Sequence, residues 1–339
     1  MFYTGIDLHK ATSYLTTVDD SGNILKRQNI RNHPINFQHY FSSIPGQHKA
    51  TVETTGSWYW VADLFQKMDI DLVLAHAKFI KAIAYAKVKT DKVDSHILAQ
   101  LLRMDFIPTA HQIDPDKREL RDLMRTRLRL AHKRTSAINS MCRILEKFNL
   151  DSPEHLSDAY KFAYDIFQVQ EQLLQNQINE LKQSLYPYLI PDDNIQRLVW
   201  IPGIGLINAF TLYLEVGNIE RFPTENHFFS YCRLVPGASN SAKKQLHKSG
   251  NKDGNKYLKI VFTDAAVHAV QYFPVIAKFY QTKLRKKHKL VARNIVAKEI
   301  ARIVYHVWSQ QKPFNHKFKG IQLSKMKSVQ WPRLASTYA

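Results

Sequence analysis

The sequence predicts an α/β domain over residues 1–112, a coiled-coil helical arm over 113–190, and a mainly α-helical domain over 195–310 followed by a basic tail over 311–339. Three observations lead to this prediction. Short β-rich segments alternate with helical patterns in the first part. Apolar residues recur every seven positions in the second part. The net positive charge is confined to the last third of the chain, and 339 residues are enough for two or three domains.

The first domain begins with segments rich in β-forming residues, separated by polar turns such as D-D-S-G at 19–22. We expect strands over 2–8, 11–18, 24–30, 48–54 and 71–77. We expect helices over 34–44, 57–68 and 91–103. The first three strands should pair antiparallel, because only short turns join them, and the later strands alternate with helices.

The arm is predicted by heptad spacing between residue 115 and about residue 186. Leu123, Leu130, Ala137 and Ile144 lie seven apart, and after a break at 150–156 so do Phe167, Leu174 and Leu181. An ordinary helical bundle packed on its own domain would show a similar pattern. The length favours an extended arm or an oligomerisation element. The proline-bearing segment 187–194 is expected to be a linker.

Positive charge is concentrated at the C-terminal end. Residues 231–339 contain 22 lysines and arginines against 3 aspartates and glutamates, which accounts for the whole net charge of +19. A localised basic block is the electrostatic footprint of a domain that binds a polyanion. The loops of this domain are expected at 217–226 and 236–256.

Other features argue against secretion and against a membrane. The N-terminal M-F-Y-T-G-I-D lacks the pattern of a signal peptide. The longest uncharged stretch, 198–214, is short for a membrane span, and a Pro-Gly pair interrupts it. Cys142 and Cys232 are the only cysteines, which fits a reducing compartment. We expect a cytoplasmic protein with no membrane partner.

Four carboxylates are candidates for chemistry. Asp7 and Glu53 end two predicted strands, and Asp91 and Asp94 lie three apart in the first turn of a predicted helix. Acidic residues in a first helical turn are usually explained by capping and the helix dipole. If all four met at one sheet edge, divalent cations would relieve their repulsion and support phosphoryl transfer.

The motifs G-I-D, E-T-T-G-x-W and K-T-D-x-x-D, in this order, resemble those of the DEDD insertion-sequence transposases and the related Piv-type DNA invertases. The resemblance implies an RNase H-like, RuvC-like N-terminal domain. It also implies that Asp7, Glu53, Asp91 and Asp94 are the ligands of magnesium or manganese.

The second half of the chain is similar to the same family. The I-P-G-I-G stretch, with Gly203 and Gly205, looks like the turn of a helix-hairpin-helix element, whose second helix can hold a phosphate at its N-terminus. A tight turn between two helices with no nucleic-acid role is the alternative.

The loop L-V-P-G-A-S-N-S-A-K-K resembles the family's serine loop. The position five residues after Pro236 is Ser241, which the resemblance implies is the nucleophile. The family pattern has Ser-Gly where this chain has Ser-Ala, and Ser239 lies two residues earlier, so both serines stay candidates. A surface loop without chemistry is the alternative.

Basic residues around and after this loop are the candidate nucleic-acid contacts. Clustered lysines and arginines would neutralise backbone phosphates, although a basic run is often only a solvated face. The candidates are Lys243, Lys244, Lys248, Lys252, Lys256, Arg285, Lys286 and Lys287.

The resemblance implies a DNA transposase that cuts and rejoins double-stranded DNA, as dimers that assemble into a tetramer, with a structured bridge RNA as a further partner. Two other functions stay open. One is a metal-dependent nuclease or junction resolvase in which water attacks. The other is a nucleic-acid-binding protein without catalysis.

Overall fold

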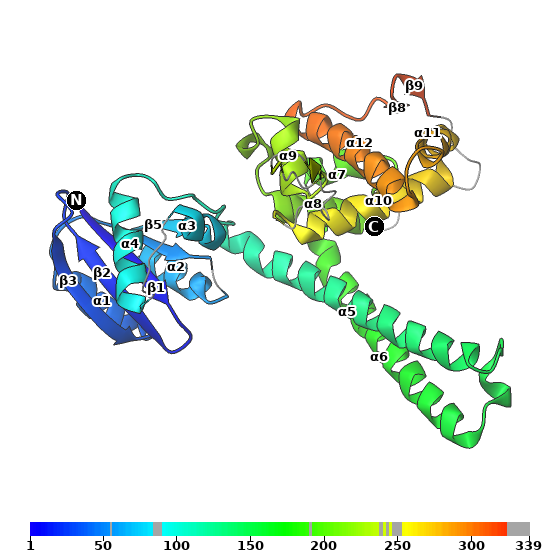
Figure 1. Ribbon diagram of the computed structural model, residues 1–339, viewed down its shortest axis with the longest axis horizontal. Coiled ribbons are helices and arrows are strands. Elements are labelled where there is room, and N and C mark those ends of the chain that lie inside the picture. The colour runs from blue at the N-terminus through cyan, green and yellow to red at the C-terminus, as the bar shows by residue number, and fades with distance from the viewer. Residues whose placement is uncertain are drawn as a thin grey trace. The chain divides into compact units, whose positions relative to one another are not determined.

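The computed structural model describes residues 1–54, 56–83, 90–188, 192–236 and 253–323, with the backbone alone at 189, 240–241 and 244–245. The chain divides into two compact units, Met1–Pro115 and Asp116–Ala339. The bounds of their elements follow, unit by unit (Figure 1).

The first unit is built on a five-stranded mixed sheet of order β3-β2-β1-β4-β5. Its strands are β1 (Phe2–Leu8), β2 (Thr12–Val18), β3 (Ile24–Arg31), β4 (His48–Glu53) and β5 (Asp71–Ala75). The first three pair antiparallel, as predicted, and β4 joins β1 in parallel with β5 beside it. A mixed sheet of this kind is consistent with an RNase H-like fold.

Helices cover both faces of this sheet. Even-numbered residues of β1, such as Ile6 and Leu8, pack in one core with α1 (Pro34–Ser42) and α2 (Trp58–Lys67). The opposite face carries α4 (Asp91–Arg103), which lies against β1 and starts where the sequence predicts. The seven-residue helix α3 (Ala77–Ile83) was not predicted. Ile80 is its one buried residue, so it shows little periodicity.

A glycine and a buried hydrogen bond seat α4 on the sheet. A β-carbon on Gly5 of β1 would lie 2.1 Å from the backbone oxygen of Ser95, so only glycine lets the helix approach this closely. The hydroxyls of Thr16 and Ser95, both fully buried, share a hydrogen bond of 2.8 Å between β2 and α4. The first turn of α4 is therefore held close to the end of β1.

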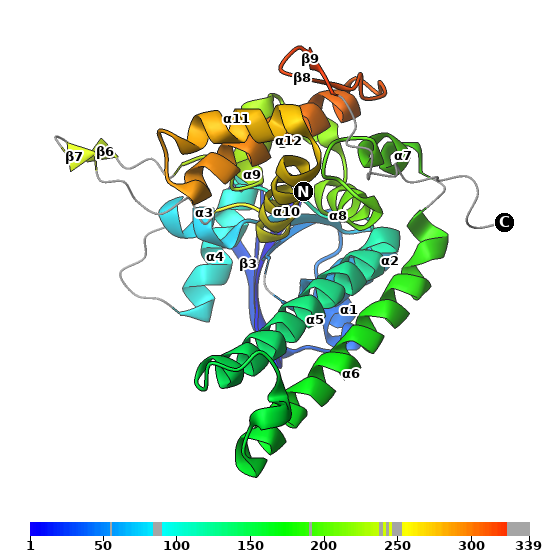
Figure 2. The same ribbon diagram turned by 90° about the vertical axis from the view of Figure 1, so that its right-hand side faces the viewer.

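The second unit begins with two helices of 32 residues each, α5 (Pro115–Glu146) and α6 (Asp158–Leu189), joined through a short 3-10 turn, η1 (Pro153–His155). Figures 1 and 2 show them side by side. Arg134 of α5 and Glu171 of α6 form an ion pair of 2.5 Å between them. The predicted start of the linker, residue 187, was wrong, because α6 continues to Leu189 and Pro187 lies inside it.

Shorter helices complete the second unit. They are α7 (Asp193–Val199), α8 (Leu206–Val216), η2 (Ile219–Arg221), α9 (Glu225–Tyr231), α10 (Lys256–Tyr272), α11 (Pro274–Leu284) and α12 (Lys289–Ser309). Two small antiparallel pairs of strands are β6 (Asn240–Ser241) with β7 (Lys244–Gln245), and β8 (Lys317–Phe318) with β9 (Ile321–Gln322).

The core of the second unit is formed largely by α8, α10 and α12. Phe314 and Phe318, which the sequence places in a basic tail, are also buried in this core. Residues 324–339 of that tail lie outside the described residues. Within the described ranges no single helix has the length and apolarity to cross a membrane. The consecutive helices α10 and α11 have the required length and apolarity only when taken together, and the chain bends by 110° between them.

Candidate functional site

The first turn of α4 places two carboxylates without using them as caps. The N-cap of this helix is Thr90, whose hydroxyl accepts a hydrogen bond of 3.3 Å from the backbone nitrogen of Val93. Asp91 and Asp94 follow in the first turn, where the positive end of the helix dipole favours negative charge. Because Thr90 caps the helix, Asp91 and Asp94 are not needed for that role.

Asp7, His9 and Asp91 bring their ligand atoms together at the end of β1. Nε2 of His9 lies 3.3 Å from Oδ2 of Asp7 and 3.3 Å from Oδ1 of Asp91. All three ligand atoms lie within 4.8 Å of one another. The Asp7 side chain is 22% exposed, whereas those of His9 and Asp91 are about half exposed. The cluster is thus accessible from solvent.

Glu53 and Asp94 lie on neighbouring positions but are not members of this three-residue group. Ile6 pairs with Val52 in the parallel register of β1 and β4, so the next residues, Asp7 and Glu53, follow side by side on adjacent strands. Asp94 lies three residues after Asp91, on the same side of α4. The strand register thus places Glu53 beside Asp7, and the helical spacing places Asp94 on the same side of α4 as Asp91.

The donor set of the cluster fits a divalent cation. Ligands of an octahedral cation at about 2.1 Å lie about 3 Å apart on adjacent vertices, close to the 3.3 Å from His9 to each carboxylate. Sequence reasoning missed His9. Its only signal was a histidine two positions after Asp7, and in an extended segment this spacing directs both side chains to the same face.

The predicted serine loop is described in part. Ser241 ends β6, and its backbone pairs with that of Lys244 in β7. Ser239, Lys243, Lys248 and Lys252 lie outside the described residues. The loop's end is anchored, because Nε of Arg233 donates to the backbone oxygen of Gly254 over 2.8 Å. Asn255 then caps α10 by accepting from the backbone nitrogens of Tyr257 and Leu258.

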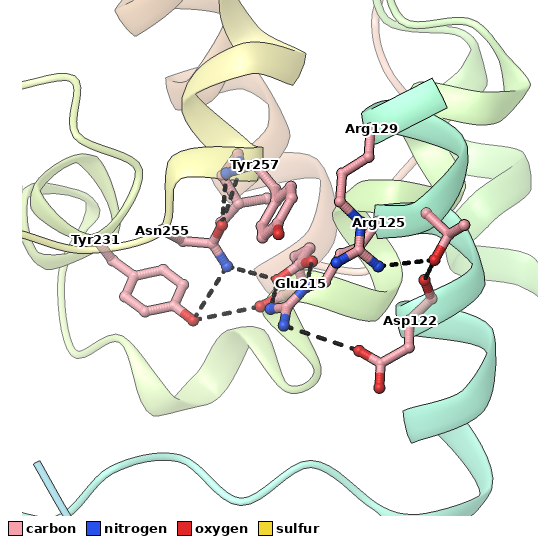
Figure 3. Close-up of polar contacts among 9 residues, drawn as sticks. Asp122, Arg125, Arg129, Glu215, Tyr231, Asn255 and Tyr257 are labelled. Atoms are coloured by element: carbon pink, nitrogen blue, oxygen red, sulfur yellow. Dashed lines mark hydrogen bonds and ion pairs between the residues drawn. The ribbon is translucent and has the colours of Figure 1, made fainter. Parts of the chain in front are cut away.

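A partly buried polar network links this anchor to α5 and α8 (Figure 3). The carboxylate of Glu215, in α8, accepts hydrogen bonds from Nε and Nη2 of Arg125, in α5, over 2.6 and 2.8 Å. Nδ2 of Asn255 donates to the same carboxylate over 2.7 Å. The Arg125 guanidinium also lies 4.6 Å from the ring centre of Tyr257. The cap of α10 is therefore tied to the base of the arm helix α5.

The other predicted contacts lie on several elements of the second unit. Lys256 is exposed at the start of α10, and Arg285, Lys286 and Lys287 are exposed between α11 and α12. On the next turn of α10, Lys259 donates to Asn294 of α12, and burial lowers the pKa of its ammonium group.

Gly203 and Gly205 lie between α7 and α8 and differ in their surroundings. A β-carbon on Gly203, whose φ is +79°, would lie 2.0 Å from the backbone oxygen of Ala265. The same atom on Gly205 would meet no described atom within 4 Å. Gly203 is thus explained by its packing against α10, whereas Gly205 borders open space.

Two family models match the chain. Residues 4–150 match a transposase family of the DEDD, IS110 type, and residues 195–281 match the family described as transposase IS116/IS110/IS902. A DEDD domain of this type implies the use of a divalent metal ion.

Relatives of known name cover most of the chain. The transposase for insertion sequence element IS1328 of Yersinia enterocolitica is 23% identical over 333 residues, covering 92% of this chain and 98% of the relative. A probable family 20 transposase of Pseudomonas aeruginosa is 21% identical, covering 91% of this chain and 96% of the relative. The pilin gene-inverting protein of Moraxella lacunata is 24% identical, covering 78% of this chain and 81% of the relative.

Proposed function

Because the chain belongs to the IS110/IS116/IS902 transposases, we propose that it mobilises an insertion sequence by cutting and rejoining double-stranded DNA at a metal centre, through Ser241. The observation that supports this most directly is the convergence of Asp7, His9 and Asp91 at the end of β1. Carboxylates brought together on a strand end and a helix start form the kind of site that phosphoryl transfer requires.

Asp7, Glu53, Asp91 and Asp94 would hold the divalent cation, magnesium or manganese. When bound, such an ion stabilises the negative charge that develops on the phosphate and on the departing oxygen. The carboxylates contribute by their placement: β1 and β4 carry two of them side by side, and the first turn of α4 carries the other two.

Ser241 would supply the nucleophile. Its hydroxyl oxygen bonds to the phosphorus of one strand, the phosphorus bond to the departing oxygen breaks, and the serine proton passes to that oxygen through solvent. A hydroxyl at another strand end then attacks the same phosphorus and releases the serine. The number of phosphate ester bonds is unchanged, so the exchange needs no external energy source.

The remaining parts of the chain have proposed roles in assembly and recognition. The arm formed by α5 and α6 would join protomers into dimers and tetramers, as a coiled coil. The α7–α8 turn would act as a helix-hairpin-helix element, and the basic block would contact DNA phosphates. A bridge RNA is a further proposed partner. The protein would act in the cytoplasm, at the nucleoid, where its DNA is.

Asp91→Asn tests the metal centre in the full-length protein. Removing one charge from the cluster should abolish strand cleavage in magnesium or manganese. It should leave DNA affinity within about twofold, because the basic residues that dominate affinity are in the second unit. Asp63→Asn, at an exposed position of α2, is the matched control and should cleave normally. Equal loss of binding and cleavage in Asp91→Asn would count against a catalytic role.

Ser241→Ala and Ser239→Ala test the nucleophile. After reaction with DNA the protein is denatured, and mass spectrometry maps the residue that retains a nucleotide. We expect the adduct on Ser241, its loss together with strand exchange in Ser241→Ala, and its retention in Ser239→Ala. Cleavage by Ser241→Ala that leaves a free phosphate end would mean that water attacks, and the enzyme would then be a metal-dependent nuclease.

A further inference from the structure

The second unit contains a cavity of about 580 Å³ between the base of the arm and the helices α8 and α10. Its walls come from α5, α6, the α7–α8 turn, α8 and α10. Pockets for small ligands have volumes of about 300–1,000 Å³. The cavity is therefore large enough for one nucleotide.

One cation in this wall, Arg127, has a buried nitrogen without a hydrogen-bond partner among the described residues. Among the described residues, no acceptor lies within hydrogen-bonding distance of Nε of Arg127, although this atom is sealed from solvent. Burial lowers the pKa of the Arg127 guanidinium, and the nearby carboxylate of Asp264 opposes that shift. A buried N–H group without a hydrogen bond is costly, and such a group is commonly satisfied by a bound ion or ligand.

Further groups in the wall favour an anion. Lys182 and the histidines His132 and His268 line the same cavity. So do Leu206, Ile207 and Asn208, the first three residues of α8. The backbone N–H groups of a first helical turn have no partner within the helix, and the residue before them, Gly205, has no side chain to cap them.

The two carboxylates in the wall are already engaged. Glu215 is paired with Arg125 through two hydrogen bonds. Oδ2 of Asp264 accepts a hydrogen bond of 2.8 Å from Asn208, and its Oδ1 lies 3.6 Å from Nδ1 of His268. Their negative charge is therefore partly compensated by neighbours.

We infer that this cavity binds a single nucleotide extruded from a nucleic-acid strand, with its phosphate between Arg127 and the N-terminus of α8. Leu128 and Ile207 line the cavity and offer apolar surface to the base. Extrusion of a base costs a few kcal/mol, which contacts inside a pocket can offset. The inference rests on the proposed function, because the strand comes from the DNA or from its RNA partner.

The test uses the full-length protein and isothermal titration calorimetry with four probes: thymidine 5′-monophosphate, uridine 5′-monophosphate, thymidine and inorganic phosphate. We expect saturable binding of both monophosphates and at least tenfold weaker binding of thymidine. A preference for uridine 5′-monophosphate would assign the cavity to RNA, and the opposite preference to DNA. Binding of inorganic phosphate as tight as that of the monophosphates would overturn the inference, because the base would then contribute nothing.

Arg127→Gln should weaken binding of the monophosphates at least tenfold. Arg129→Gln, two residues further on α5 but not among the lining residues, is the matched control and should bind normally. Without ligand, Arg127→Gln should melt at the same temperature as the wild type or higher, because it removes a charge that is largely buried and has an unsatisfied Nε. A lower melting temperature together with unchanged nucleotide binding would show a purely structural arginine and would refute the inference.

Gly205→Ala provides a second variant that should fold. Its backbone φ is −86°, and the added methyl group meets no described atom within 4 Å. It should keep the melting temperature and weaken binding of the monophosphates several-fold by crowding the N-terminus of α8. Wild-type affinity in both Arg127→Gln and Gly205→Ala would refute the inference while leaving the Asp91 and Ser241 tests untouched. Failure of those two tests, with nucleotide binding intact, would refute the proposed function alone.

Discussion

The guanidinium of Arg125 holds the carboxylate of Glu215 through two parallel hydrogen bonds, of 2.6 and 2.8 Å, and the Glu215 side chain is only 2% exposed. This geometry joins the arm helix α5 to α8 inside the second unit. Removing one partner of a buried pair leaves an uncompensated charge, which typically costs about 3–5 kcal/mol. We therefore expect Glu215→Gln to lower the free energy of unfolding by about 3 kcal/mol.

A double-mutant cycle, followed by chemical denaturation, measures the coupling energy between Arg125 and Glu215. The double variant Arg125→Met, Glu215→Gln should lose less free energy of unfolding than the two single variants lose together. The control pair is Lys161 and Asp165, half exposed on α6 and 3.5 Å apart. A helical pair of this kind is worth about 0.3–0.5 kcal/mol. Equal coupling energies for the two pairs would contradict the buried arrangement.

Gly5→Ala should displace α4 from the sheet. The new methyl group would meet the backbone of Ser95 at 2.1 Å and of Ala99 at 2.4 Å, and neither backbone atom can move without the helix. We expect a loss of about 1–3 kcal/mol in the free energy of unfolding, with weaker binding of Mn²⁺. Gly56→Ala, whose methyl group meets no described atom within 4 Å, is the control and should unfold like the wild type.

His9→Ala should weaken Mn²⁺ binding by about tenfold or more, as loss of a ligand or of its close partner commonly does. The expectation follows from the position of Nε2, 3.3 Å from oxygens of both Asp7 and Asp91. Calorimetric titration of the full-length protein with Mn²⁺ gives the affinity. The exposed His39 of α1 supplies the control change, His39→Ala. Tighter Mn²⁺ binding by His9→Ala would instead show that the imidazole competes with the metal ion.

Arg285→Gln, Lys286→Gln and Lys287→Gln should each weaken duplex binding and flatten its dependence on salt. Each phosphate contact contributes about 0.9 to the slope of log affinity against log salt concentration. Fluorescence anisotropy over a salt series measures this slope. Lys67→Gln, exposed on α2 in the first unit, should leave the slope unchanged. Unchanged slopes in all three test variants would exclude this turn from the DNA contact.

The two cysteines should differ sharply in reactivity. Cys142 is exposed on α5, whereas Cys232 is buried, and its burial raises the pKa of the thiol well above the ordinary value. Because the thiolate is the reactive form, iodoacetamide at pH 8 should label Cys142 within minutes and Cys232 only on unfolding. Peptide mass spectrometry reads out both sites. Rapid labelling of Cys232 in the native protein would contradict the packing around it.

The sequence predicted the sheet well because β1, β2 and β4 have strongly β-forming residues between clear turns. It also predicted the start of α4, since Thr90 and the two aspartates form a recognisable helix N-terminus. It missed α3, which is short and buries a single residue. It began the linker too early, at residue 187, because α6 continues to Leu189 and a proline in the last turn of a helix removes only one internal hydrogen bond.

The candidate site was only partly predictable. Asp7 and Asp91 were expected to meet, and the structure places them together with His9. His9 joins them because the packing of α4 on Gly5 brings Asp91 to the end of β1, and no local pattern encodes that contact. Arg127 was missed for the same reason: a lysine-rich and arginine-rich helix shows charge, but not which cation is buried.

The order of the two units along the chain has a consequence for synthesis. Residues 1–115 have a hydrophobic core of their own and carry all four candidate carboxylates, whereas the excess positive charge lies in the last 109 residues. Domains generally fold in the order in which they leave the ribosome. The first 230 residues together carry no net charge, and the net charge of +19 is added by the last 109 residues. The strongest attraction of the growing polypeptide to ribosomal and messenger RNA would therefore arise in the last third of translation.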